Sequence, residues 1–340
     1  MPFWIELAVP AISFILAVLI GRFLIPALAK IGAKQSISVY APETHKKKAG
    51  TPMMGGLMFI ISSAAALFIG LLLYNRFSDE AVLRIDTSAL WKLLTGFAFM
   101  IANAAIGFAD DFTKAVRKKN DGLSVAQKLI VQFGITALYL FALYVQGDTS
   151  TYVYIPFFGN IDLWWFYYPI MMLIIVFLTN AVNLTDGIDG LCGSVTAIAA
   201  VSLGMLCSAM NFDEYTLLCL AVAGGCVGFL VYNLHPASVF MGDVGSMYLG
   251  GFVVAVGFAL RIHVMLVIVM LVYVIECGSV FLQRTYFKVT HGKRLPFVTP
   301  VHHHFERKMN WSENKIVITF TVAALIFGAA ANIIFWIDKH

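Results

Sequence analysis

Ten apolar segments, each about 20 residues long, are the feature that most constrains the fold of this chain. A helix needs about 20 apolar residues to cross the hydrocarbon core of a bilayer, so each segment is long enough to span a membrane. Together they take up most of the 340 residues. They cover residues 3–27, 53–74, 91–109, 127–146, 164–182, 190–210, 214–233, 244–260, 262–282 and 316–337.

The amino-acid composition excludes two other classes of protein. Hydrophobic residues make up 60% of the chain and charged residues only 12%, against about 25% charged in soluble domains. A soluble protein could not bury so much apolar surface, and disordered chains are polar and rich in charge. The connections between segments are too short for a separate soluble domain. We therefore predict an all-α integral membrane protein in a lipid bilayer, with ten transmembrane helices in one domain, residues 1–340.

Positive charge is distributed unevenly between alternate loops. Seventeen Lys and Arg residues lie in the odd-numbered loops and four in the even-numbered loops. Short loops rich in Lys and Arg stay on the cytoplasmic side, so the odd loops are predicted to be cytoplasmic and both termini external. In the external loop 151–163, aromatic and β-branched residues flank Gly159-Asn160. This pattern predicts either a small β-hairpin or an irregular aromatic loop at the headgroups.

Four groups of polar residues lie where apolar segments end. The topology places all four in odd loops, on the predicted cytoplasmic face. Acidic residues at membrane depth are costly and are usually functional. The groups are Asp110 and Asp111 in GFADDFTK, Asn183, Asp186 and Asp189 in NAVNLTDGIDG, Asp243 in FMGDVGS, and His302, His303 and His304 in TPVHHHFE.

Each group also has a purely structural interpretation. The Asp-Asp pair could be a solvated helix end, although a helix C-terminus disfavours negative charge and the pair favours a cation. NLTDGIDG is typical of a turn, although carboxylates three residues apart share a face if the segment is helical. Asp243 could cap a helix, and the same helix N-terminus suits phosphate. The histidines could form a solvated loop, or could bind phosphate and transfer protons near neutral pH.

Taken together, the groups indicate phosphoryl-transfer chemistry. Carboxylates without thiolate partners suit Mg²⁺ or Mn²⁺ rather than zinc. The basic residues near these motifs, some of them expected from topology alone, add the positive charge that pyrophosphate needs, because phosphoryl transfer depends on neutralising charge. We predict a Mg²⁺-dependent transferase that joins a soluble phosphorylated donor to a lipid acceptor. A secondary transporter is the alternative from another class, but transporters hold their ionisable groups near the bilayer midplane.

Five motifs, in this order, resemble the phospho-N-acetylmuramoyl-pentapeptide-transferase family of the polyprenyl-phosphate N-acetylhexosamine-1-phosphate transferase superfamily. They are KKKAGTPMMGG, GFADDFTK, NAVNLTDGIDGL, FMGDVGS and TPVHHHFE. The resemblance implies a step in peptidoglycan biosynthesis, in which UDP-N-acetylmuramoyl-pentapeptide and undecaprenyl phosphate give lipid I and UMP. It also implies the bacterial cytoplasmic membrane, an active site facing the cytoplasm and Mg²⁺ as cofactor. Members of the family are often homodimers, and no nucleic-acid partner is expected.

The nearest alternative is a transferase of UDP-N-acetylglucosamine, against which the triple histidine argues. The ninth helix is expected to be broken near Gly278 and Gln283. Met53 departs from the family pattern, in which Thr is common.

The resemblance also implies roles for individual residues. Asp110, Asp111, Asp243, His302 and His303 match catalytic residues, and Asp243 matches the residue that contacts Mg²⁺. Substrate-binding residues are matched by Lys48, Lys114, Lys128, Asn183, Asp186, Asp189, Phe240, Gln283 and His304, with Phe240 as a stacking surface for uracil.

Overall fold

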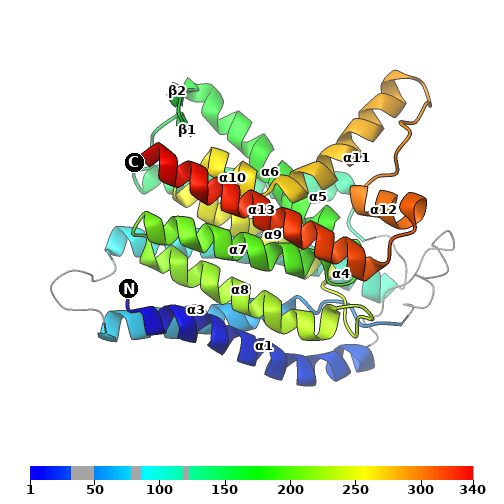
Figure 1. Cartoon of the computed structure of the whole chain (residues 1–340), viewed down its shortest axis with the longest axis horizontal. Helices are drawn as coiled ribbons and strands as arrows, with labels where there is room; N and C mark the ends of the chain where they lie inside the picture. The colour runs from blue at the N-terminus through cyan, green and yellow to red at the C-terminus, as the bar shows by residue number, and fades with distance from the viewer. Residues whose placement is uncertain (32–49, 78–85, 118–121, 340) are drawn as a thin grey trace.

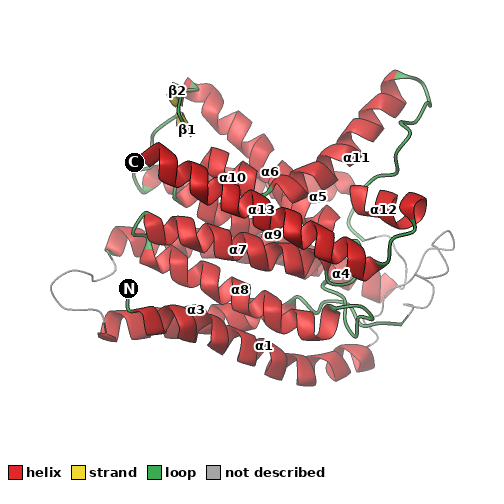
Figure 2. Cartoon of the chain, in the orientation of Figure 1, coloured by secondary structure: helices red, strands yellow, loops and turns green. Residues whose placement is uncertain are grey.

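The computed structural model describes residues 1–31, 50–77, 86–117 and 122–339. Most of the long helices run side by side along the long axis of the molecule, and the loops gather at its two ends (Figures 1 and 2). The first half of the chain forms α1 (Phe3–Ile31), α3 (Leu57–Phe77), α4 (Thr87–Arg117), α5 (Val125–Val145), β1 (Tyr152–Ile155), β2 (Gly159–Asp162) and the 3₁₀ helix η1 (Trp164–Phe166). The second half forms α6 (Tyr167–Thr185), α7 (Leu191–Ala209), α8 (Asp213–Asn233), α9 (Gly242–Ala259), α10 (His263–Val269), α11 (Leu271–Val289), α12 (Val301–Met309) and α13 (Glu313–Lys339).

The apolar segments of the sequence become the long helices. Among the described residues, nine helices are long and apolar enough to cross a membrane. The pair α10 and α11, bent by 80°, supplies a tenth if it is one broken span. The prediction of an all-α multi-pass membrane protein is therefore confirmed. The ninth span is broken as expected, but the break lies at Met270, ahead of the predicted region near Gly278 and Gln283.

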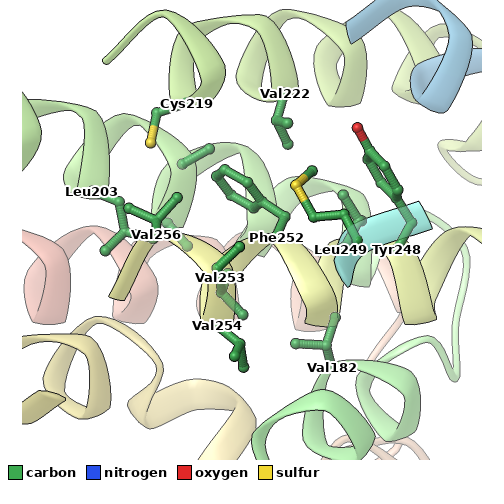
Figure 3. Close-up of a cluster of buried hydrophobic side chains, with 14 of the residues drawn as sticks. Val182, Leu203, Cys219, Val222, Tyr248, Leu249, Phe252, Val253, Val254 and Val256 are labelled. Atoms are coloured by element: carbon green, nitrogen blue, oxygen red, sulfur yellow. The ribbon is translucent and has the colours of Figure 1, made fainter. Parts of the chain in front are cut away.

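Helix α9 forms the centre of the bundle. In its most apolar window, 94% of the residues are buried, against 22% in α1 at the edge. Figure 3 shows Phe252 and Val256 of α9 among side chains from α7 and α8, such as Leu203 and Cys219. Small residues in membrane helices let backbones approach closely. The N-terminal end of α9 is therefore fixed by its neighbours on several sides, which matters because Asp243 lies there.

The two ends of the bundle differ in content. Both termini and the β-hairpin lie at one end, and the C-terminal end of α4 and all of α12 lie at the other (Figure 1). This arrangement agrees with the predicted alternation of loops. Which end faces the cytoplasm stays a prediction.

Residues 151–163 form the hairpin rather than an irregular loop. Its antiparallel register pairs Tyr152 with Asp162 and Ile155 with Gly159. Arg261 forms an ion pair with Asp148. The same guanidinium donates hydrogen bonds to the carbonyl oxygens of Ser150 and Tyr152, both at 2.8 Å. The turn between α9 and α10 thus holds the hairpin against the bundle.

Candidate active site

Three carboxylates from two distant motifs meet at the end of the bundle opposite the hairpin. Asp110 and Asp111 lie on α4 and Asp243 lies on the first turn of α9, and one oxygen of each lies within 4.8 Å of the others. The two backbones touch here, because a Cβ at Gly107 would lie only 2.1 Å from the carbonyl oxygen of Asp243. Gly242 has φ of +76°, a conformation that glycine adopts at low cost. These two glycines allow α9 to begin directly against α4.

Two lysines bind the three carboxylates. The Lys114 ammonium lies 2.5 Å from Asp110 Oδ2 and 3.2 Å from Asp243 Oδ2. The Lys128 ammonium, on α5, lies 3.1 Å from Asp110 Oδ1 and 2.8 Å from Asp243 Oδ2. When all three carboxylates are ionised, two ammonium groups leave one net negative charge at the centre, and in that state the cluster favours a further cation.

The hydrogen bonds of the carboxylates fix some oxygens and leave others available. Asp111 Oδ2 accepts a hydrogen bond from the Val244 amide at 3.1 Å. Asp243 Oδ1 accepts one from the Asn183 side chain at 3.1 Å, and Asn183 also donates to Ser246 Oγ at 2.8 Å. Asp111 Oδ1 is buried and accepts no hydrogen bond from the described part of the chain, and the Lys114 ammonium lies 3.9 Å away. Buried polar atoms are normally satisfied, so this oxygen is oriented to receive a ligand.

These observations allow a test of whether a divalent cation fits the cluster. Magnesium binds hard oxygen ligands and is usually held by one or two carboxylates together with substrate phosphates. The three carboxylates supply such oxygens, and Asp111 Oδ1 lacks a donor of its own. The residues therefore fit a hard divalent cation.

Asp189 lies in a second cluster rather than in the first. Its Oδ2 accepts a hydrogen bond from the Ala237 amide at 3.1 Å and lies 3.1 Å from His235 Nδ1. The Asp189 amide donates a hydrogen bond to Glu313 Oε2 at 3.2 Å. Glu313 Oε2 in turn lies 3.6 Å from His235 Nδ1. We call Asp189, His235 and Glu313 the loop cluster. It joins the connections α6–α7 and α8–α9 to the first turn of α13.

Asp186 follows the last residue of α6, three residues before Asp189, and is half-buried. Burial raises the pKa of Asp186 to about 8, and the negative charges of Asp243, Asp111 and Asp189 add to the effect. At neutral pH this side chain carries a proton. It can therefore donate a hydrogen bond to a phosphate oxygen, which an ionised carboxylate cannot do.

The first histidine of the triple motif is fully buried against a carboxylate. His302 Nδ1 lies 3.2 Å from Glu276 Oε2, and the His302 amide donates to Glu276 Oε1 at 3.0 Å. A Cβ at Gly187 would lie 2.2 Å from His302 Nε2. His302 therefore packs directly on the turn that carries Asp186.

The other two histidines make different contacts. His303 Nδ1 lies 2.8 Å from Glu306 Oε2, and its ring centroid lies 4.3 Å from that of His302. Burial lowers the pKa of His303, and the positive charge of Arg307 adds to the effect. The neutral imidazole that this favours offers one ring nitrogen as a hydrogen-bond donor and the other as an acceptor. The Val298 amide donates to His304 Nδ1 at 3.3 Å, so His304 supports the preceding loop.

Glu276 was not among the residues predicted from the sequence. It is the one acidic residue within the apolar segment 262–282, and a carboxylate inside such a segment is usually functional. That signal could have identified it. His235 and Glu313 gave no comparable signal, because both lie outside the apolar segments.

The remaining predicted residues lie around these clusters or outside the described part. Phe240 is half-buried, and its backbone bonds to the segment before α3, with Gly55 donating to its carbonyl oxygen at 2.8 Å. Gln283 Oε1 accepts a hydrogen bond from the Leu295 amide at 3.0 Å and lines a separate pocket. Lys48 lies outside the described residues.

A family model and several curated bacterial proteins are similar to this chain. The model of the family described as glycosyl transferase family 4 matches residues 91–262, from α4 to the end of α9. A phospho-N-acetylmuramoyl-pentapeptide-transferase of Clostridium perfringens is 41% identical over 317 residues, which cover 93% of this chain and 92% of the relative. The enzymes of that name from Halalkalibacterium halodurans and Listeria monocytogenes are 40% and 38% identical, over 94% and 93% of this chain and 94% of each relative. This chain belongs to the phospho-N-acetylmuramoyl-pentapeptide-transferases of glycosyl transferase family 4.

Proposed function

We propose that the protein transfers phospho-N-acetylmuramoyl-pentapeptide from its UDP carrier to undecaprenyl phosphate in the bacterial cytoplasmic membrane, giving lipid I and UMP. The observation that carries the proposal is the meeting of Asp110, Asp111 and Asp243 with two lysines at one end of an apolar helix bundle. A soluble nucleotide reaches such a site from water. A lipid phosphate reaches it from the membrane.

Asp243 and Asp111 would hold Mg²⁺. Asp243 is already oriented by Asn183, and Asp111 Oδ1 has no hydrogen-bond donor among the described residues. A bound Mg²⁺ neutralises negative charge on the pyrophosphate of the donor.

Catalysis by the chain's own residues consists of positioning and charge neutralisation. Lys114 and Lys128 bind phosphate oxygens, and Asp110 orients the phosphate of the lipid acceptor. An oxygen of that phosphate attacks the β-phosphorus of the donor, and the bond to the UMP oxygen breaks. The second pKa of such a phosphate is near 6, by analogy with phosphoserine. The nucleophile is therefore mostly ionised at pH 7, and no strong base is required.

A purified preparation tests the proposal directly. We expect Mg²⁺-dependent release of UMP from UDP-N-acetylmuramoyl-pentapeptide when undecaprenyl phosphate is present. UDP-N-acetylglucosamine serves as the competing donor. Preferential turnover of that sugar would assign the protein to the other branch of the superfamily. Absence of UMP release from either donor would overturn the proposal.

A second measurement separates direct attack from a two-step route through an aspartyl phosphate. The enzyme is incubated with donor labelled in the β-phosphate, without the lipid acceptor. We expect no label on the protein after denaturation. A labelled aspartate would replace direct attack by the two-step route.

A further inference from the structure

A hollow of 610 Å³ lies between α11, the loop 290–300 and α12. Figure 1 shows α11 extending away from the bundle and the chain returning through this loop to α12. Five basic side chains line the hollow, which we call the basic pocket: Arg284, Lys288, Arg294, Arg307 and Lys308. Its volume lies in the range of about 300–1,000 Å³ that is typical of ligand sites.

These five cations have no negatively charged partner in the part of the chain that the structure describes. Among the described residues, none of the five has a carboxylate within 4.0 Å. Arg294 instead lies over the ring of Phe287, with its guanidinium carbon 5.8 Å from the ring centroid. A concentration of like charge raises the local potential and attracts an oppositely charged ligand. The pocket is therefore complementary to an anion.

The walls of the pocket indicate which kind of anion it suits. Phe287, Leu295, Pro296, Phe297 and Val298 form apolar surface between the cations. An inorganic anion would leave that surface uncovered. A ligand that carries carboxylates on a partly apolar framework would cover it, and Arg binds a carboxylate through two parallel hydrogen bonds.

The pocket adjoins the proposed reaction centre. Helix α12 carries Arg307 and Lys308 on its last turn and His302 on its first turn. His302 in turn packs on Gly187. The hydrogen bond from the Leu295 amide to Gln283 fixes the loop between them. A donor bound at the carboxylates can thus extend its far end past the histidines into the basic pocket.

The orientation of α11 argues against a lipid headgroup as the ligand. Leu282 and Val289 are 54% and 72% exposed. With 3.6 residues per turn, they lie on the face of α11 opposite Arg284, Phe287 and Lys288. An exposed apolar face on a helix with basic residues on the other side rests on the bilayer. The basic pocket then faces away from the lipid.

We propose that the basic pocket binds the carboxylate groups of the peptide carried by the donor. This inference rests on the proposed function, since it assigns a subsite for one part of that substrate. It makes these basic residues determinants of donor specificity, with no part in breaking the pyrophosphate bond.

The test compares two donors in the full-length enzyme. Arg294→Gln combined with Lys288→Gln removes two cations, and Lys293→Gln, an exposed residue of the same loop that does not line the pocket, is the matched control. We expect the double variant to raise KM for the peptide-bearing donor roughly tenfold, from the typical strength of exposed ion pairs. Its kcat should stay near wild type. Its KM for UDP-N-acetylmuramic acid without peptide should not change.

Several outcomes would overturn the inference. An unchanged KM, or an equal rise in KM for both donors, would show that the peptide does not bind in the pocket. A donor whose peptide carboxylates are amidated should bind wild type and double variant equally, and a persisting difference would contradict the charge argument. If the difference in KM between wild type and double variant vanished in nanodiscs without anionic lipid, the ligand of the pocket would be a lipid headgroup.

Direct calorimetry of donor binding separates this inference from the proposed function. If the wild type released no UMP, the function would fail. Weaker binding of the peptide-bearing donor by the double variant would still support the pocket. Equal affinities in the two proteins would overturn it.

Discussion

Two clusters at the same end of the bundle each bring three possible metal ligands within 4.8 Å of one another, yet they are built differently. We call Asp110, Asp111 and Asp243, which we propose to be catalytic, the catalytic cluster. Backbone amides bind Asp110 and Asp111 there, but the tips of two long lysines supply the balancing charge. In the loop cluster, the contacts with Asp189 and Glu313 come from backbone amides and the ring of His235.

The difference lies in what holds each charge. An ammonium on a flexible four-carbon stem can move to a ligand, whereas a backbone amide is fixed by the fold. The catalytic cluster can therefore exchange its partners for a cation and phosphates. The loop cluster ties three chain segments together. Proximity of ligand atoms alone does not distinguish a reactive site from a structural one.

The largest expected effect comes from the catalytic cluster. Asp243→Asn removes one charge at the point where both lysines converge, and we expect kcat to fall on the order of 1,000-fold. The thermal unfolding temperature should stay close to wild type. The measurement is UMP release at saturating Mg²⁺. Glu313→Gln, which removes one charge from the loop cluster, is the matched control. Wild-type turnover by Asp243→Asn would contradict the assignment of Asp243 to the reaction centre.

Glu276 tests whether a residue that acts through His302 affects turnover. Glu276→Gln keeps an acceptor for the His302 amide but removes the charge opposite the imidazole. We expect roughly a tenfold loss in kcat with little change in KM, as for groups that orient a ligand. The pH profile of kcat should shift as well. Glu214→Gln, another buried glutamate, is the control. Unfolding without any kinetic change in the remaining folded enzyme would make Glu276 purely structural.

The loop cluster should show the converse pattern. Glu313→Gln weakens the contact with His235 and the bond from the Asp189 amide. We expect a loss of about 1 kcal/mol in unfolding free energy, with kcat within about twofold of wild type on the basis that the group touches no substrate. Calorimetry and UMP release measure the two effects. A large fall in kcat at unchanged stability would erase the distinction between the clusters.

The last prediction concerns the pH dependence contributed by Asp186. Its folded-state pKa of about 8 lies above the ordinary value near 3.9, so folding favours the protonated side chain. This contribution is fully present below about pH 4 and is lost progressively as the pH rises to about 8. Metal-free Asp186→Asn should therefore lose less thermal stability than wild type between pH 6 and pH 9. Parallel curves for the two proteins would contradict the shift.

The spans could be predicted from the sequence because the length of an apolar run is a local property. The break at Met270 could not, because it falls inside a continuous apolar run without glycine or proline. Packing against neighbouring helices decides where such a run bends. The hairpin was one of two expectations for residues 151–163, since aromatic residues beside Gly159-Asn160 suit both.

The site was predictable as a set of residues at one end but not as two clusters. The alternation of spans brings the ends of α4, α6 and α9 together, so their motifs had to share a face. The partners of Asp189 depend on tertiary contacts with His235 and Glu313, which no spacing reveals. The cations of the basic pocket were interpreted as a topology signal, and only the return of the chain through loop 290–300 brings them together.

Helix α13 is fastened at both ends, and this has a mechanical consequence. Glu313 anchors its first turn in the loop cluster, and Asp338 on its last turn binds the hairpin through Tyr154 and the Phe157 amide. Its 27 residues make a strut about 40 Å long at 1.5 Å per residue. A helix longer than the bilayer is thick can tilt, kink or thicken the bilayer, but a tilt of α13 would move the hairpin and the loop cluster with it. We therefore expect a change in bilayer thickness to shift both ends of the protein together.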